Sequence, residues 1–227
     1  MQTDTLRFES RNGNVHIDVP IRLIHEFKEI FMENAYGRGL GKPVPKKAII
    51  IDIGANVGFF TLFAVSNYPS ARVYSFEPVG ANFVQLKKNA DLNPDFPISC
   101  CNEAVYDKCG QVQINYESAG EFSTTANVSA SSGTTGHSEN VRCTTLESVF
   151  QRYAIEICDL LKMDCEGSEY AIVYSCPEAI LKRISQMAIE VHEGPAPEDN
   201  IDALEQYLSD KGYTTERYQR HMLWAWR

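Results

Sequence analysis

The sequence lacks three features that would assign it to a class at once: a cysteine framework, a membrane-length apolar run and a basic cluster. Its seven cysteines are odd in number and contain no C-x-x-C pair, which argues against a disulfide framework and a zinc knuckle. No apolar stretch approaches the roughly 20 residues of a membrane span, and the first residues lack the basic-then-apolar order of a signal peptide. We therefore expect a soluble cytoplasmic protein with reduced cysteines and no membrane partner.

Positive charge is also scarce. The chain has 21 Lys and Arg against 30 Asp and Glu, a formal net charge of -9, and no long basic run. This balance disfavours nucleic acid as the main partner, because Lys and Arg bind most backbone phosphates. A neutral or cationic small molecule fits the charge better. At 227 residues the chain is expected to form one domain with insertions, and its sequence does not indicate an oligomeric state.

What the sequence does contain is a regular alternation of strand and helix patterns over residues 48–227. Such alternation is typical of an α/β domain in which a mostly parallel, Rossmann-like sheet carries helices on both faces. The expected strands cover 48–53, 72–77, 97–102, 159–164 and 185–191, with a terminal antiparallel hairpin over 214–226. The expected helices cover 57–66, 79–92, 168–175 and 198–210.

Two segments depart from this alternation. Residues 1–47 are expected to cap the domain, with a hairpin of Leu6–Glu9 and Val15–Val19 followed by an amphipathic helix. The glycine-rich, cationic stretch 36–42 could instead close over the cofactor or the substrate. Residues 105–143 form an insertion rich in Ser, Thr and Gly, and long loops of this kind are often functional. We expect this insertion to form a wall of the substrate site; the alternative is a surface loop.

The most informative segment follows the first expected strand and reads Asp52-Ile-Gly54-Ala-Asn56-Val-Gly58-Phe59. The glycines permit a tight turn and a close approach of the backbone to a ligand, and the helix that follows offers unpaired N–H groups. Asn56 stands where a dinucleotide fingerprint has its second glycine, so the phosphate cradle is incomplete. The segment therefore favours a nucleoside cofactor without phosphates, although a purely structural turn is the alternative.

A second acid follows the next expected strand, in the sequence Phe76-Glu77-Pro78. Glu77 lies about 20 residues beyond the turn, where an acid accepts hydrogen bonds from the ribose of a cofactor. S-adenosylmethionine fits both features: its ribose can meet Glu77, and its amino acid end can meet the turn near Asp52. We predict S-adenosylmethionine as the cofactor.

Acids and a histidine follow the later strands. Because ligands bind at the carboxyl ends of parallel strands, we expect Asp164 and Glu166 to face the cofactor crevice, Asp164 as a cofactor contact too. Ser168 is expected to cap the next helix, and Glu169 either caps it or faces the crevice. His192 ends the last parallel strand and is suited to accepting a proton, the alternative being a packed or capping histidine.

The same residues could hold a metal. Asp164 and Glu166, with a third donor from Glu190 or His192, would offer Mg²⁺ an oxygen-rich set of ligands. We do not favour this alternative and expect no metal ligand in the chain.

Together these motifs resemble the class I methyltransferases, and most closely their FkbM-type branch. The resemblance covers roughly 48–192 and rests on four motifs, at 52–58, at 76–78 with Asn82 and Asn89, at 102–104 and at 161–169. It implies a seven-stranded sheet of order 3-2-1-4-5-7-6, with the last strand antiparallel, and S-adenosylmethionine as cofactor. By matching position it implies that Gly54, Asn56 and Gly58 shape the turn at the methionine end, that Glu77 holds the ribose and that Glu103 with Ala104 flanks the adenine.

The predicted reaction is O-methylation of a hydroxyl on a small molecule of sugar or natural-product type. A sulfonium methyl is already activated, so the enzyme must align the acceptor oxygen and remove its proton. We expect His192 to be the base and Asp164 or Glu166 to orient the hydroxyl. The alternatives are an NAD-type oxidoreductase on the same fold and a cofactor-binding protein without turnover. The sequence does not determine the acceptor or the choice between oxygen and nitrogen.

Overall fold

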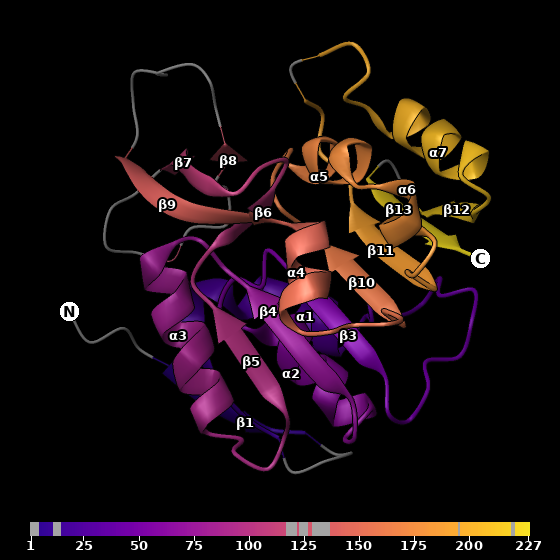
Figure 1. Cartoon of the computed structure of the whole chain (residues 1–227). Helices are drawn as coiled ribbons and strands as arrows, with labels where there is room; N and C mark the ends of the chain where they lie inside the picture. The colour runs from indigo at the N-terminus through magenta and orange to yellow at the C-terminus, as the bar shows by residue number, and fades with distance from the viewer. Residues whose placement is uncertain are drawn as a thin grey trace.

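The computed structural model describes residues 5–10, 15–116, 122, 127–128, 137–194, 196–218 and 221–227. A seven-stranded sheet forms its centre (Figure 1). In spatial order the strands are β5 (Ile98–Cys101), β4 (Arg72–Phe76), β3 (Ile49–Ile53), β10 (Leu160–Met163), β11 (Gln186–Glu190), β13 (Met222–Trp226) and β12 (Thr214–Tyr218). Numbered along the chain within this sheet, the order is 3-2-1-4-5-7-6, and β13 is antiparallel to both of its neighbours. The predicted sheet order is confirmed.

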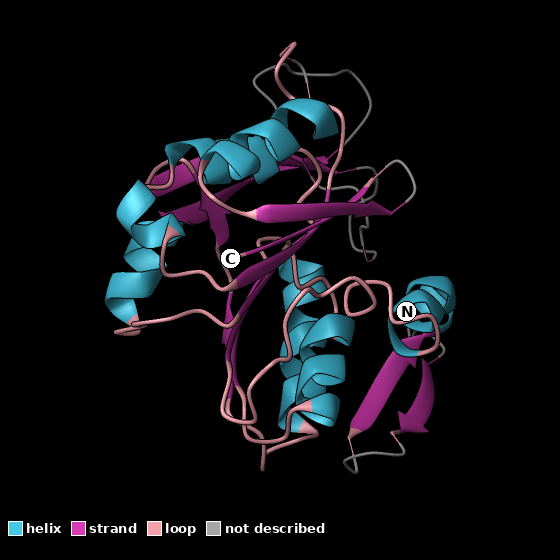
Figure 2. Ribbon diagram, turned by 90° about the vertical axis from the view of Figure 1, so that its right-hand side faces the viewer, coloured by secondary structure: helices cyan, strands magenta, loops and turns pink. Residues whose placement is uncertain are grey.

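Helices cover both faces of the sheet, as the edge-on view in Figure 2 shows. One face carries α1 (Ile24–Phe31), α2 (Phe59–Asn67) and α3 (Gly80–Asp91); the other carries α4 (Leu146–Arg152), α5 (Glu169–Ser175), α6 (Glu178–Leu181) and α7 (Ile201–Asp210). Successive strand residues point to opposite faces, so Ile50 packs with α2 while Ile51 packs with α4 and α5. The short helix α6 was not predicted.

The N-terminal segment packs on the outer side of α2, as an additional layer beyond the helices that cover the sheet. Its hairpin pairs β1 (Thr5–Glu9) with β2 (His16–Pro20), as predicted, although the expected turn at 12–14 lies outside the described residues. A 3-10 turn at Ile21–Leu23 then leads into α1. Aromatic side chains hold α1 on α2: the rings of Phe27 and Phe59 lie 5.6 Å apart, as do those of Phe31 and Phe63.

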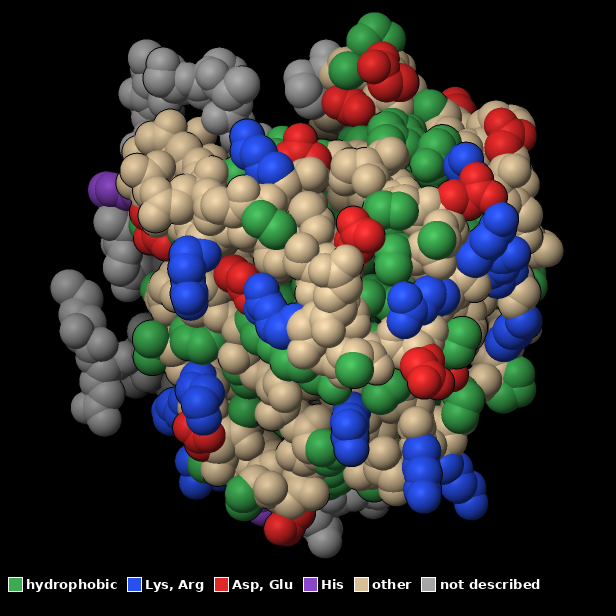
Figure 3. Space-filling view, viewed as in Figure 1, with side chains coloured by type: hydrophobic (Ala, Val, Ile, Leu, Met, Phe, Trp, Pro, Cys, Tyr) green, Lys and Arg blue, Asp and Glu red, His purple; other side chains and the backbone are tan. Residues whose placement is uncertain are grey.

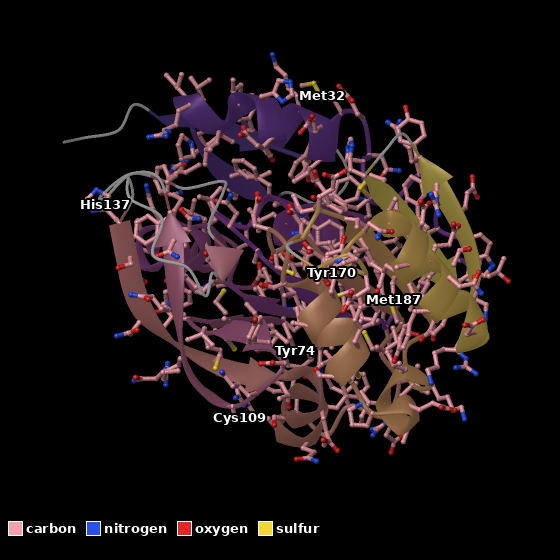
Figure 4. All side chains as sticks on the ribbon, turned by 90° about the horizontal axis from the view of Figure 1, so that it is seen from above. Met32, Tyr74, Cys109, His137, Tyr170 and Met187 are labelled. Carbon is pink, nitrogen blue, oxygen red and sulfur yellow. The ribbon has the colours of Figure 1, made fainter. Side chains whose placement is uncertain are left out.

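The insertion folds into a small sheet of its own. Its strands are β6 (Ala104–Tyr106), β9 (His137–Thr145), β7 (Gly110–Tyr116) and β8 (Asn127–Val128), in that spatial order. The strands β7 and β9 form an antiparallel pair, while 117–121, 123–126 and 129–136 lie outside the described residues. In the view from above, His137 at the start of β9 lies at the periphery of the molecule (Figure 4).

The surface of the face in Figure 3 carries Lys and Arg interspersed with Asp and Glu, without a continuous basic patch on that face. No helix of the described residues has both the length and the apolarity that crossing a membrane requires. All seven cysteines are free in this structure.

Candidate active site

The glycine turn after β3 brings two strand ends into contact. Gly54 has a φ of +72°, and a Cβ atom at this position would lie 1.7 Å from the carbonyl oxygen of Asp164. The backbone N–H groups of Gly54 and Ala55 donate to the carbonyl of Phe76 at 3.1 and 3.0 Å. Gly54 therefore lets the ends of β3, β4 and β10 meet, as the expected close approach requires.

Asp52 lies beneath this turn. It is fully buried, accepts a hydrogen bond from the Thr61 hydroxyl at 2.7 Å, and lies 3.2 Å from the Nζ of Lys162. Lys162 in turn donates to the carbonyl of Gly54 at 2.7 Å. Asp52, predicted as a cofactor residue, therefore contacts the turn through Lys162 and lines neither of the two cavities described below.

Lys162 is a buried cation that the sequence reading passed over. Burial by itself would lower the pKa of this ammonium group, but the carboxylates of Asp52 and Asp164 outweigh it and raise the pKa. Its Nζ also lies 5.2 Å from the ring centre of Tyr36. The available signal was a lysine inside the otherwise apolar strand Leu160–Met163.

Glu77 ends up beside the turn, as predicted. Its carboxylate is 4% exposed and accepts backbone N–H groups from Asn56 at 2.7 Å and from Val79 at 2.9 Å. Burial raises the pKa of Glu77 to about 7, although the two N–H groups oppose that shift. A carboxylate held in this way retains lone pairs for a further donor.

A cavity of about 60 Å³ adjoins Glu77. Its lining includes the predicted cofactor residues Gly54, Asn56, Glu77, Ala104 and Asp164. The other predicted residues lie elsewhere: Gly58 is the N-cap of α2, Phe59 lines a second cavity, and Glu103 forms an ion pair with Arg152. Ala104 therefore lines this cavity, and Glu103 does not.

The second cavity is larger, about 260 Å³, and adjoins the first. Both cavities are lined by Gly54, Asn56, Asp164 and Glu166. The outer walls of the larger cavity come from the N-terminal segment, including α1 and Arg38, and from Tyr218, His221 and Met222 near the C-terminus. The described residues of the 105–143 insertion line only the smaller cavity, through Val105 and Ile114. Among the described residues, the N-terminal segment and not the insertion forms the wall of the larger cavity.

The three predicted catalytic residues lie close together, and two of them, Asp164 and Glu166, line both cavities. One ligand atom each from Asp164, Glu166 and His192 lies within 4.8 Å of the other two. The Nδ1 of His192 is 3.0 Å from the Oε1 of Glu169, and its Nε2 is 3.6 Å from the Oε2 of Glu166. Tyr170, labelled in Figure 4, donates its hydroxyl to the carbonyl of His192 and so ties α5 to this loop.

The expected caps of α5 require correction. Ser168 occupies the N-cap position, but its side chain makes no capping hydrogen bond. Glu169 instead reaches back and accepts the N–H of Cys165 at 3.0 Å while it also contacts His192. Glu169 thus holds the turn that precedes α5 and orients the histidine, which explains why a charged residue is fully buried there.

Two residues of this cluster, Glu166 and His192, have raised pKa values. Burial raises the pKa of Glu166 to about 7. Burial would lower the pKa of His192, but the carboxylates of Glu169 and Glu166 raise it to about 9. At neutral pH His192 is therefore charged when no ligand is bound.

Tyr36, from the N-terminal segment, reaches the same strand ends. Its hydroxyl lies 2.8 Å from the Oδ2 of Asp164 and 2.9 Å from the Oε2 of Glu190, and Trp224 donates its indole N–H to the Tyr36 carbonyl at 2.9 Å. Burial and the neighbouring Asp164 raise the pKa of Glu190. Closure of the site by the stretch 36–42 was only an alternative to a cap on the domain, and Tyr36 was not singled out in it.

The sheet order, the glycine turn and the buried acid after the second parallel strand together define a class I methyltransferase fold. A crystal structure of Methyltransferase FkbM from Methylobacillus flagellatus KT shows the same fold, with a TM-score of 0.60 and 15% identity over 89% of this chain and 49% of that one. The Methyltransferase FkbM domain matches residues 52–215. The chain belongs to the FkbM methyltransferase family.

Curated relatives share this region. Methyltransferase sdnD of Sordaria araneosa is 24% identical over 84% of this chain and 82% of its own length. The 31-O-demethyl-FK506 methyltransferase FkbM of Streptomyces tacrolimicus is 26% identical over 83% and 80%. The AMB antimetabolite synthetase AmbE of Pseudomonas aeruginosa is 25% identical over 87% of this chain, which spans only 11% of that protein. Tyr36 and the rest of the N-terminal wall lie outside the matched domain.

Proposed function

We propose that this chain uses S-adenosylmethionine to methylate a hydroxyl group of a small molecule. The observation that carries the proposal is the pair of adjoining cavities that share Asp164 and Glu166, the smaller one beside the buried acid Glu77. Such a layout suits a cofactor and an acceptor that meet at the shared residues. A relative named for 31-O-demethyl-FK506 supports an oxygen of a small molecule as the acceptor.

The residues of the smaller cavity fit the cofactor. Glu77 would accept the ribose hydroxyls, Ala104 would lie at the adenine, and the turn at Gly54 would receive the methionine end. The Oδ1 of Asn56 is buried without a hydrogen-bond partner among the described residues, and thus awaits a donor such as the ammonium group of the cofactor. When bound, S-adenosylmethionine supplies an activated methyl group: its carbon–sulfur bond breaks as a carbon–oxygen bond forms, and S-adenosylhomocysteine leaves.

The chain would contribute position and proton removal. Asp164 and Glu166 would orient the acceptor hydroxyl, and His192 would receive its proton as a general base. Because a base must be neutral and the pKa of His192 is raised to about 9, the rate through this base should rise with pH up to about 9. Tyr36 would hold Asp164 in place from the N-terminal wall.

Cofactor affinity should depend on the ionisation of Glu77. Its pKa is raised to about 7, so the carboxylate form is lost as the pH falls through 7. Since the ionised carboxylate is the better acceptor for two ribose hydroxyls, we expect affinity for S-adenosylhomocysteine to fall up to about tenfold from pH 8 to pH 6. Calorimetric titration would measure this, with Glu77→Gln binding weakly and without that pH dependence. An unchanged affinity in the parent chain would contradict the role of Glu77.

Transfer of a labelled methyl group tests the function itself. The chain is incubated with methyl-labelled S-adenosylmethionine and fractionated small-molecule extracts, and labelled products are treated to distinguish methyl ethers from methylamines. His192→Ala should slow transfer by about 10²- to 10⁴-fold, whereas His25→Ala, at a side chain 80% exposed on α1, should not. Cofactor binding without transfer would indicate a protein without turnover, and a thermal shift with NAD alone would indicate an oxidoreductase. Full activity of His192→Ala would remove the histidine from the reaction.

A further inference from the structure

We propose that Asp164, Glu166 and His192 bind a divalent cation of the Mn²⁺ type where the two cavities meet. The use of this cation in methyl transfer rests on the proposed function, but its binding does not. This assignment replaces our expectation that the chain holds no metal ligand.

The three ligand atoms have suitable spacing. One atom from each side chain lies within 4.8 Å of the other two. Two ligands of one cation, each bound at about 2.1–2.5 Å, lie roughly 3–5 Å apart, the larger value for ligands on opposite sides. Each of the three side chains is about one quarter exposed, so a cation can reach them from solvent.

Glu169 provides an independent indication. Its side chain is fully buried, and its Oε1 lies 3.0 Å from the Nδ1 of His192. This contact makes Nδ1 the hydrogen donor and turns Nε2 toward Glu166, as the outer carboxylate does for most metal-binding histidines. The Oε2 of Glu169 has no hydrogen-bond partner among the described residues. A positive charge on the far side of the ring, either a proton on Nε2 or a bound cation, compensates such a buried carboxylate.

The neighbouring charges leave this position open to a cation. Lys162 lies 3.8 Å from the Oδ2 of Asp164, but its ammonium group is already engaged by Asp52 and by the carbonyl of Gly54. The hydroxyl of Tyr36 contacts both Asp164, at 2.8 Å, and Glu190, at 2.9 Å. His192, and not Glu190, belongs with Asp164 and Glu166 to the group whose ligand atoms all lie within 4.8 Å of one another, so we take it as the third ligand. One imidazole and two carboxylates suit Mn²⁺ better than Mg²⁺, which prefers oxygen ligands.

The location indicates a role for such a cation in the proposed reaction. Asp164 and Glu166 line both cavities, so a cation held by them would face the acceptor oxygen next to the cofactor. It would withdraw electron density from that oxygen and ease loss of its proton to solvent or to a nearby carboxylate, with His192 then acting as a ligand and not as the base.

Titration of the purified chain with Mn²⁺, followed by the electron paramagnetic resonance signal of the free ion, tests the proposal directly. We expect one saturable site per chain. Glu166→Gln and His192→Ala should each weaken binding at least about tenfold, and Glu169→Gln should weaken it about 10- to 100-fold through the histidine. The matched control is His25→Ala, because His25 lies 3.5 Å from Glu29 without belonging to the cluster. Circular dichroism melting verifies that each variant is folded.

Absence of a saturable site, or equal binding by the parent chain and by folded Glu166→Gln and His192→Ala, would overturn the proposal. The two hypotheses fail separately. Label transfer without Mn²⁺ binding would retain the methyltransferase and assign the three residues to acid–base chemistry alone. Saturable, cluster-dependent Mn²⁺ binding without transfer from any extract would retain the cation site and count against the proposed reaction.

Discussion

Gly54→Ala is expected to abolish cofactor binding and to lower the free energy of unfolding by about 3 kcal/mol or more. The new Cβ atom would lie 1.7 Å from the carbonyl oxygen of Asp164, and the φ of +72° is itself unfavourable for alanine. The obstacle is backbone, so no side-chain rotation can relieve it. The ends of β3 and β10 would have to separate, and with them the residues shared by both cavities.

Gly80→Ala is the matched control. Gly80 begins α3, and no atom lies within 4 Å of the position its Cβ would take. A glycine-to-alanine change in a helix should alter stability by no more than about 1 kcal/mol, in the stabilising direction. Urea unfolding and calorimetric titration with S-adenosylhomocysteine would measure both variants. Wild-type stability and affinity in Gly54→Ala would show that the turn tolerates a side chain.

Lys162→Met should lower the free energy of unfolding by about 3–5 kcal/mol. Lys162 is 3% exposed, and its removal leaves Asp52, which is fully buried, with only the Thr61 hydroxyl as a donor. Methionine retains most of the volume, so the loss measures charge and not packing. Cofactor affinity should also fall, because Lys162 holds the carbonyl of Gly54. Denaturant unfolding gives the stability, and Lys87→Met is the surface control.

That control separates a buried ion pair from an exposed one. Lys87 and Asp91 form a pair on α3 with side chains 53% and 62% exposed, so its loss should cost less than about 1 kcal/mol. The double variant Asp52→Asn/Lys162→Met completes the cycle. If the unpaired Asp52 carboxylate causes the loss of stability, the double variant will lose less free energy of unfolding than the two single variants lose in sum. Strictly additive losses would show that Asp52 and Lys162 act independently.

Much of the fold follows from local pattern. The apolar runs and helical periods place every strand of the central sheet within a few residues, because a buried strand in an α/β sheet carries few polar side chains. The order of the strands came from the resemblance of the motifs to a family, and the observed pairing agrees with it. The insertion was harder to interpret, because β7 and β9 pair across the segment that contains the undescribed ranges.

The sequence by itself determined the elements, the glycine turn and the gathering of acids at strand ends, since each depends on residues close together in the chain or on the polarity of parallel strands. Only the tertiary structure decided which of these residues face a ligand. Asp52 is buried beneath the turn, and Glu103 pairs with Arg152. Tyr36 contacts Asp164, which lies 128 residues further along the chain. Such choices depend on how helices and strands pack against one another, and periodicity along the chain does not contain that information.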